Sequence, residues 1–178
     1  TPEQETLLDK KYKSFSRNGA NLNNKDKETL REIDSELAKL KLTFGEHVLA
    51  ETNNYELHIT KEEDLEGLPD GVIEAAAQTA EQRNKEGWVF TLDYPSYIPF
   101  MKYAKNRDLR KQLALANGAK GFQDNEYNNE AIVLKIASLR HQRAQLLGYN
   151  THADFVLEER MASTPTNVLD FLNNLLSK

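Results

Sequence analysis

The sequence contains no cysteine among its 178 residues. This absence excludes a disulfide framework, a thiolate nucleophile, and any zinc or iron–sulfur site with cysteine ligands. It bounds the cellular compartment only weakly, because a secreted protein can also lack cysteine. The length suits one moderately large domain or two small ones, which is enough to bury a hydrophobic core.

The sequence also lacks an excess of positive charge and any long apolar run. It has 23 Lys and Arg against 28 Asp and Glu, a formal net charge of -5 and a mean hydropathy of -0.70. Nucleic-acid binding requires clustered Lys and Arg, so no nucleic-acid partner is expected. No stretch approaches the roughly 20 apolar residues that span a bilayer, and no signal-peptide core is present. We therefore expect no membrane association and a cytoplasmic location, with a periplasmic one left open.

The first 51 residues show helical periodicity. A helix over residues 2–17 is predicted to begin with a capping box of Thr1 and Gln4 and to stop at Gly19. A second helix over residues 23–50 carries one apolar stripe, made of Leu30, Ile33, Leu37, Leu40 and Phe44. The stripe is too short for a sustained coiled-coil seam, so packing inside the domain is favoured. The short connection predicts an antiparallel helical hairpin over residues 1–51.

Residues 52–95 are predicted to form a β-α-β insert. Apolar residues alternate at Tyr55, Leu57 and Ile59, and a β-rich run covers residues 88–92. Between them, a helix over residues 70–84 presents a face of small residues that permits close packing. Two strands can pair in either sense and need cover to be stable. A minor two-stranded sheet leaning on helices is therefore expected.

Residues 96–178 return to helical patterns. Helices are predicted over residues 96–104, 108–117 and 125–147, followed by one that Thr151 caps and one that Thr164 opens. The helix after Thr151 is expected to bury Phe155, Val156 and Met161. The predicted fold class is mainly α: a single helical region over residues 1–178, built as a multi-helix array with a small two-stranded β insert.

The four histidines do not form a recognisable metal motif. No two of them stand at positions i and i+4 of one helix, and H-E-x-x-H is absent. Ordinary surface or edge histidines are the favoured interpretation of His47, His58, His141 and His152.

Three other stretches are candidate binding or catalytic sites. The acidic run 124–130 resembles a calcium loop but lacks its mid-loop glycine and final bidentate Glu, which favours an acidic helix N-terminus. The basic run 140–143 could grip a phosphate or a partner carboxylate, although salt bridges along a helix are favoured. The turn 93–97 could line a ligand surface or could stop a strand and cap a helix, and its Ser96 has no nearby histidine. The residues thus assign no catalytic or metal-binding position, and the substrate-binding residues are unknown.

Several motifs nevertheless resemble one enzyme family. Residues 139–149 read L-R-H-Q-R-A-Q-L-L-G-Y, followed by Ala153-Asp154-Phe155 and Glu159-Arg160-Met161-Ala162. This order resembles the zinc metallopeptidases related to thimet oligopeptidase. Further matching stretches are Gly19-Ala20-Asn21-Leu22, Leu68-Pro69, residues 92–97 and Asn106-Arg107-x-Leu109-Arg110. The resemblance covers essentially the whole chain and is closest to the bacterial peptidyl-dipeptidase and oligopeptidase A branch, with peptidyl-dipeptidase preferred.

The resemblance implies a large helical enzyme whose deep channel admits only short peptides. In that family, zinc is held by the two histidines of H-E-x-x-H and a glutamate further along, and the motif's glutamate activates the water. None of those residues occurs in this sequence. The parent enzyme is therefore expected to bind zinc and to release C-terminal dipeptides from short peptides. This part is expected to bind no zinc, to precede the catalytic core and to help wall the channel.

The two ends of the sequence favour an excised fragment. It starts at Thr1 rather than Met, and an amphipathic pattern is still running at Lys178. Such a fragment would be inactive, would normally pack against the rest of its parent chain, and would expose apolar surface around the final helix or self-associate. The alternative is an independent helical interaction module without catalytic activity, which would bind a partner through the Leu30 stripe or the tyrosine-rich turn.

Overall fold

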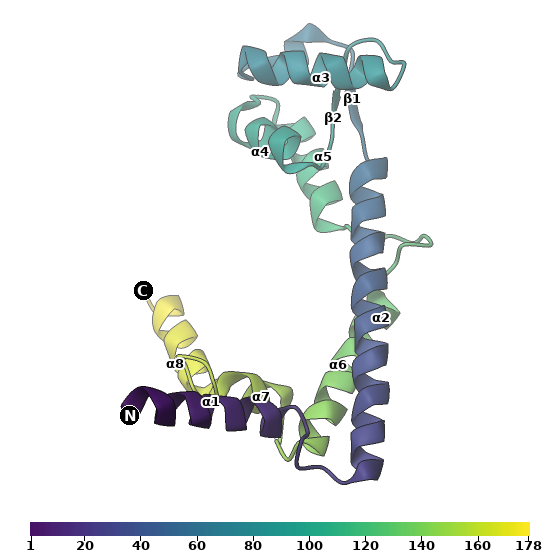
Figure 1. Cartoon of the computed structure of the whole chain (residues 1–178). Coiled ribbons are helices and arrows are strands. Elements are labelled where there is room, and N and C mark those ends of the chain that lie inside the picture. The colour runs from purple at the N-terminus through teal and green to yellow at the C-terminus, as the bar shows by residue number, and fades with distance from the viewer. The chain divides into compact units, whose positions relative to one another are not determined.

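The computed structural model describes residues 1–178 and is mainly α-helical, as predicted (Figure 1). A two-stranded antiparallel sheet is its only β-structure. The elements in chain order are α1 (Pro2–Arg17), α2 (Asn24–Asn54), β1 (Leu57–Ile59), a 3-10 turn (Glu62–Leu65), α3 (Asp70–Gln82), β2 (Trp88–Phe90), α4 (Tyr94–Tyr103), α5 (Arg107–Gly118), α6 (Glu130–Leu146), α7 (His152–Leu157) and α8 (Pro165–Leu176). None of these helices is both long and apolar enough to cross a bilayer.

The chain divides into two compact units, and each is described by itself. The central unit comprises residues 43–131, and the discontinuous unit comprises residues 1–42 and 132–178. The division of the chain into segments 1–51, 52–95 and 96–178 remains a prediction.

The central unit is built around the small sheet. Strands β1 and β2 pair antiparallel, with Leu57 opposite Phe90 and Ile59 opposite Trp88. Helix α3 packs against β2 (Figure 1), and its small residues Ala76 and Ala80 are buried, which confirms the predicted close-packing face. The fully or almost fully buried residues of this core include Leu57, Ile59, Leu65, Leu68, Phe90, Leu92, Phe100 and Leu113.

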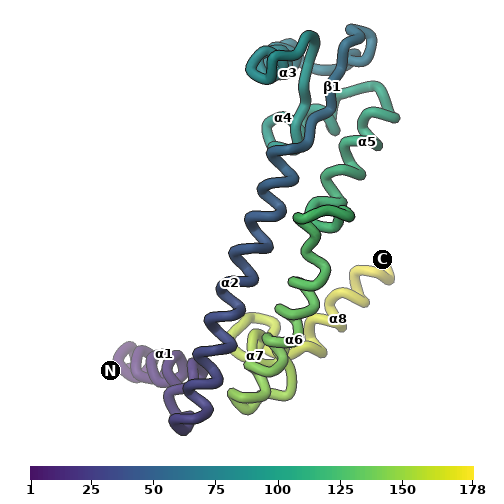
Figure 2. The backbone as a smooth tube through the Cα atoms, turned by 90° about the vertical axis from the view of Figure 1, so that its right-hand side faces the viewer, coloured from purple at the N-terminus to yellow at the C-terminus, as the bar shows by residue number.

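In the discontinuous unit, α6 runs alongside the first half of α2 (Figure 2). Ile33 and Leu37 of α2 are buried together with Leu139 of α6, and Leu40, Ile136 and Leu146 pack at the edge of this cluster. The apolar stripe of residues 30–40 is therefore used for packing inside the unit, as predicted.

The antiparallel hairpin expected from the short connection after α1 is not formed. Helix α1 runs across α2 rather than along it (Figures 1 and 2). Its end is a glycine turn: the Gly19 N–H donates to the Ser16 carbonyl at 3.0 Å, and the Ala20 N–H donates to the Phe15 carbonyl at 3.0 Å. This turn redirects the chain and leaves the side chains of Leu8, Tyr12 and Phe15 exposed.

Two further expectations were wrong in detail. The helix predicted over residues 125–147 begins only at Glu130, because Asn125 and Asn128 turn the chain first. Their side-chain oxygens accept hydrogen bonds from the Tyr127 and Glu130 N–H groups, each at 2.8 Å. Met161 is fully exposed rather than buried, since α7 ends at Leu157 and leaves Met161 in a turn.

Candidate functional site

The four histidines lie in separate environments. The His47 Nδ1 is 2.9 Å from the Asn129 Oδ1, and the His58 Nε2 is 2.7 Å from the Glu86 carbonyl oxygen. His141 is exposed on α6. Nowhere in the chain do three or more His, Asp or Glu side chains gather in a way that could hold a metal ion. The residues present do not fit the zinc centre that the family resemblance implies, so no zinc-dependent step is derived from this chain.

The acidic stretch 124–130 belongs to a loop of the central unit. Buried polar groups hold this loop in place by hydrogen bonds. The Glu51 carboxylate is 9% exposed and accepts from the Gly121 N–H at 2.5 Å and from the Asn125 side-chain amide at 2.7 Å. Asn129 is fully buried, and its backbone N–H donates to the Gly121 carbonyl at 2.7 Å. These contacts give the loop a structural role.

A small pocket of about 210 Å³ opens beside this loop. Its wall includes the buried hydroxyl of Tyr55, which has no hydrogen-bond partner within bonding geometry. Burial raises the pKa of the Tyr55 phenol, and the Gln112 side chain opposes that shift. The pocket brings no nucleophile and base together, so it defines no catalytic centre.

The tyrosine-rich turn is also explained by local structure. The Ser96 hydroxyl accepts from the Thr91 N–H at 3.0 Å, and the Thr91 hydroxyl donates to the Asp93 carboxylate at 3.0 Å. These bonds stop β2 and start α4. No histidine lies beside Ser96 to activate it, so the turn is a strand stop and helix start rather than a nucleophile site.

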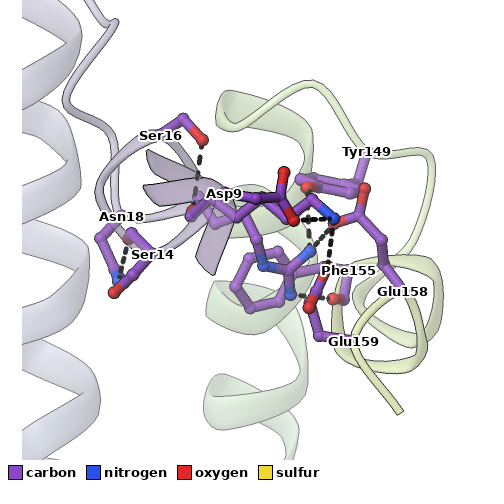
Figure 3. Close-up of polar contacts among 10 residues, drawn as sticks. Asp9, Ser14, Ser16, Asn18, Tyr149, Phe155, Glu158 and Glu159 are labelled. Carbon is purple, nitrogen blue, oxygen red and sulfur yellow. Dashed lines mark hydrogen bonds and ion pairs between the residues drawn. The ribbon is translucent and has the colours of Figure 1, made fainter. Parts of the chain in front are cut away.

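In the discontinuous unit, Tyr149, Phe155 and Glu158 lie together beside the end of α1 (Figure 3). Arg17 at the end of α1 contacts all three of these residues. Its guanidinium donates to the Tyr149 hydroxyl at 3.1 Å and to the Phe155 carbonyl at 2.6 Å, and it forms an ion pair with Glu158. The guanidinium carbon also lies 4.6 Å from the centre of the Phe155 ring. We call Arg17, Tyr149, Phe155 and Glu158 the Arg17 cluster. It fastens α1 to the region around α7.

The longest family-like motif, residues 139–149, builds the end of α6 and presents Tyr149 to this cluster. Leu139 and Ala144 are buried. Gly148 has a positive φ of 89°, and the Tyr149 N–H donates to the Ala144 carbonyl at 2.9 Å. A glycine in this left-handed conformation ends the helix without strain. The glycine–tyrosine step of the motif therefore has a clear role in folding.

The shorter motifs have similar roles. The Asn106 side-chain oxygen accepts from the Asp108 and Leu109 N–H groups at 3.0 and 3.2 Å and so caps α5. Gly19 has a φ of 86°, and a Cβ atom there would come within 2.5 Å of the Leu30 side chain. These motif residues support the fold.

Several charged side chains line a pocket of about 470 Å³ on α2, α6 and α7. Its basic side chains are Lys41, Arg140, Arg143 and His152, and Asp34 is its only acid. The Arg143 Nε donates to the Asp34 carboxylate at 2.7 Å, so the basic run forms a salt bridge to another helix rather than along its own. We call this the cationic pocket.

His152 lies half-buried in the wall of the cationic pocket. Burial lowers its pKa, and the charges of Arg140, Arg143 and Lys41 lower it further. The sequence indicated a possible anion site at Arg140 and Arg143, but it gave no role to Lys41 and indicated only an ordinary histidine at His152. Their only signal was the helical phase of α2 and the position of His152 next to the Thr151 cap.

Comparison with known proteins shows that this chain is similar in sequence to peptidases. Residues 100–178 match the sequence model of peptidase family M3. The chain is 33% identical to oligopeptidase A of Haemophilus influenzae over 98% of its own length and 26% of that protein. It is also 33% identical to saccharolysin of Saccharomyces cerevisiae, over 99% of its length and 24% of that protein. Identity to dipeptidyl carboxypeptidase of Salmonella typhimurium is 26%, over 96% of its length and 25% of that protein.

The comparisons confirm the resemblance to the thimet-oligopeptidase-like family. The chain spans about a quarter of the length of these curated relatives. The similarity to each of the three covers nearly all of the chain, so both structural units take part in it.

Proposed function

We propose that this chain is part of a zinc-dependent metallopeptidase that hydrolyses short peptides, and that the chain alone is catalytically inactive. The observation that carries the proposal is the match to three peptidases over 96–99% of the chain. The absence of a clustered metal-ligand set in these 178 residues supports the second half of the proposal. The interaction-module alternative has no comparable support in the comparisons.

The chemistry of such an enzyme would come from residues outside this chain. Zinc, when bound, lowers the pKa of its water ligand and polarises the scissile carbonyl. The residues of this chain would instead form a helical wall before the catalytic core. The packing of α2 on α6 and the Arg17 cluster would hold that wall in shape.

For the product, we propose release of C-terminal dipeptides, as the name dipeptidyl carboxypeptidase describes for one relative. Identity to oligopeptidase A is higher, at 33% against 26%, so cleavage elsewhere in the peptide is the competing specificity. Mass spectrometry of the products that the parent enzyme forms from an N-acetylated hexapeptide distinguishes the two specificities. Dipeptides released only from the C-terminus support the proposal, and larger C-terminal products contradict it.

The zinc requirement is tested on the parent enzyme. Its reading frame beyond Lys178 should encode H-E-x-x-H. Peptide hydrolysis should disappear when a chelator removes the metal and should return when zinc is added. A complete reading frame without the motif, or hydrolysis that resists the chelator, would contradict the proposal. We propose a cytoplasmic location, which cell fractionation checks.

We further propose that the remainder of the parent chain covers the apolar faces of α1 and α8. The exposed apolar residues of α8 are Leu169, Phe171, Leu172, Leu175 and Leu176. An uncovered face of this kind favours self-association of the isolated chain. Sedimentation velocity should show oligomers that dissociate in Leu172→Glu but persist in the exposed polar control Asn173→Glu. A monomer at every concentration would overturn this part of the proposal.

A further inference from the structure

We propose that the cationic pocket of the discontinuous unit is a binding site for a small oxyanion, a carboxylate or a phosphate. The pocket has room for one, at about 470 Å³. Its basic side chains come from three helices, and α2 is distant in sequence from α6 and α7, so the fold assembles the charge. The inference stands on the 178-residue chain alone and does not depend on the proposed zinc enzyme.

The charges of the pocket are unbalanced. Asp34 neutralises Arg143, to which it is bound through the Arg143 Nε at 2.7 Å and, more weakly, through an Nη at 3.5 Å. Lys41 and Arg140 have no carboxylate within 4.0 Å. Two positive charges therefore remain to attract an anion, and the Arg140 guanidinium can donate two parallel hydrogen bonds to a carboxylate or phosphate.

His152 adds a third potential donor. Its Nδ1 is buried and has no hydrogen-bond partner, and its ring packs beside the Phe155 ring at a centroid distance of 6.3 Å. A buried polar atom without a protein partner is unusual in a folded protein and is available to bond to a water, an ion or a ligand. In the pocket, His152 faces Arg140 and Arg143 from α6 and Lys41 from α2, while Asp34 of α2 is the only acid.

An oxyanion in the pocket would reverse the electrostatics of His152. The neighbouring cations now disfavour its protonated form, whereas a bound anion would favour that form. Binding should therefore strengthen as the pH falls towards the ordinary range of histidine. The pKa of His152 should in turn rise when the anion is present, because the two equilibria are linked.

Two sources of the oxyanion share this chemistry: a free anion and the C-terminal carboxylate of a short peptide. Calorimetric titrations of the 178-residue chain with inorganic phosphate, acetate, trialanine and trialanine amide distinguish them. Saturable binding of phosphate or acetate supports a free anion, and additional binding of trialanine but not its amide supports a peptide terminus. Absence of saturable binding for phosphate, acetate and trialanine, or binding of the amide as tight as that of the best anionic probe, would overturn the proposal.

Matched variants locate the binding. Lys41→Gln and Arg140→Gln each remove one unpaired charge from an exposed side chain, so both should leave the circular dichroism spectrum unchanged. Each should weaken binding of the best probe about tenfold, the loss expected for a charged hydrogen bond. The controls Lys39→Gln and Lys135→Gln remove the same charge from the same two helices outside the pocket. Equal weakening by the controls would overturn the site.

The histidine gives a second readout. The NMR signal of the His152 ring, assigned by its loss in His152→Gln, should titrate at higher pH when phosphate is present. The His141 signal should not move, since His141 lies outside the pocket. An unchanged titration of His152 at saturating phosphate would contradict the geometry proposed here.

Discussion

The central and discontinuous units bury apolar surface to very different extents. The central unit has a continuous core, whose fully buried side chains include Phe90, Phe100 and Leu113. The discontinuous unit buries a cluster of only Ile33, Leu37 and Leu139, with three partly buried neighbours. Its α1 and α8 leave many large apolar side chains exposed. The central unit is therefore stabilised mainly by its apolar core, whereas hydrogen bonds and ion pairs contribute a larger share in the discontinuous unit.

The largest expected effect comes from removing an aromatic side chain from the core of the central unit. Phe100→Ala should cost about 3–5 kcal/mol, because it leaves a cavity beside Phe90, whose ring centre lies 4.6 Å away. The matched control Phe171→Ala, on the exposed face of α8, should cost about 0.5 kcal/mol or less. Urea denaturation followed by circular dichroism measures both. Similar losses in the two variants would show that the units do not differ in this way.

The second prediction concerns the polar closure of the central unit. Glu51→Gln replaces one of the two accepting oxygens with a donor, which then faces either the Gly121 N–H or the Asn125 amide. We expect a loss of about 1.5–3 kcal/mol in the free energy of unfolding. Glu46→Gln, an exposed residue of the same helix, is the control and should change little. If Glu51→Gln is as stable as the control, the loop does not depend on this carboxylate.

The third prediction sharpens the description of the discontinuous unit. Arg17→Ala removes the hydrogen bonds to Tyr149 and Phe155 and the ion pair with Glu158, and should cost about 1–2 kcal/mol. The effect should be local: relative to the unchanged chain, the variant should show faster amide hydrogen exchange in α1 and the same exchange in α3. Lys11→Ala, in an exposed and unpaired position of α1, serves as the control. Unchanged exchange in α1 would show that the Arg17 cluster does not fasten it.

The smallest expected effect is the pH dependence from His152. Burial and the neighbouring cations hold the pKa of His152 below its ordinary value of 6.5 in the folded chain, so the unfolded chain binds a proton more readily as the pH falls through 6.5. Stability should therefore decrease between pH 6.5 and the lower folded pKa, and His152→Gln should remove this decrease. Thermal melts at pH 7.5 and 5.5 test it, with His141→Gln as the control. A decrease that persists in His152→Gln would point to another group.

Much of the fold could be predicted because its signals are local. The capping box of Thr1 and Gln4, the Thr151 and Thr164 caps and the apolar stripe of α2 all depend on residues within a few positions of one another. Each of these predictions was confirmed. The sequence left the tyrosine-rich turn open between a ligand surface and a strand stop, and its hydrogen bonds in the structure are those of a strand stop.

The failures arose where the outcome depends on distant residues or on competition between local signals. The course of α1 is set by the Arg17 contacts with residues more than 130 positions away, which no periodicity reveals. Helix α6 starts late because the side-chain oxygens of Asn125 and Asn128 accept hydrogen bonds from backbone N–H groups two residues on. These bonds form turns where the acidic residues predicted the start of a helix. The cationic pocket likewise joins Lys41 to Arg140 and His152 across the sequence.

The central proposal is that these 178 residues contribute structure to a larger peptidase and are catalytically inactive alone. No group of three or more His, Asp or Glu side chains in them could hold a metal ion. The most direct measurement is a fluorogenic peptide assay on the purified chain with one equivalent of zinc, with the bound metal counted after dialysis. The account predicts no hydrolysis above the buffer rate and no stoichiometric zinc. Zinc-dependent hydrolysis by a preparation with one bound zinc per chain would contradict it.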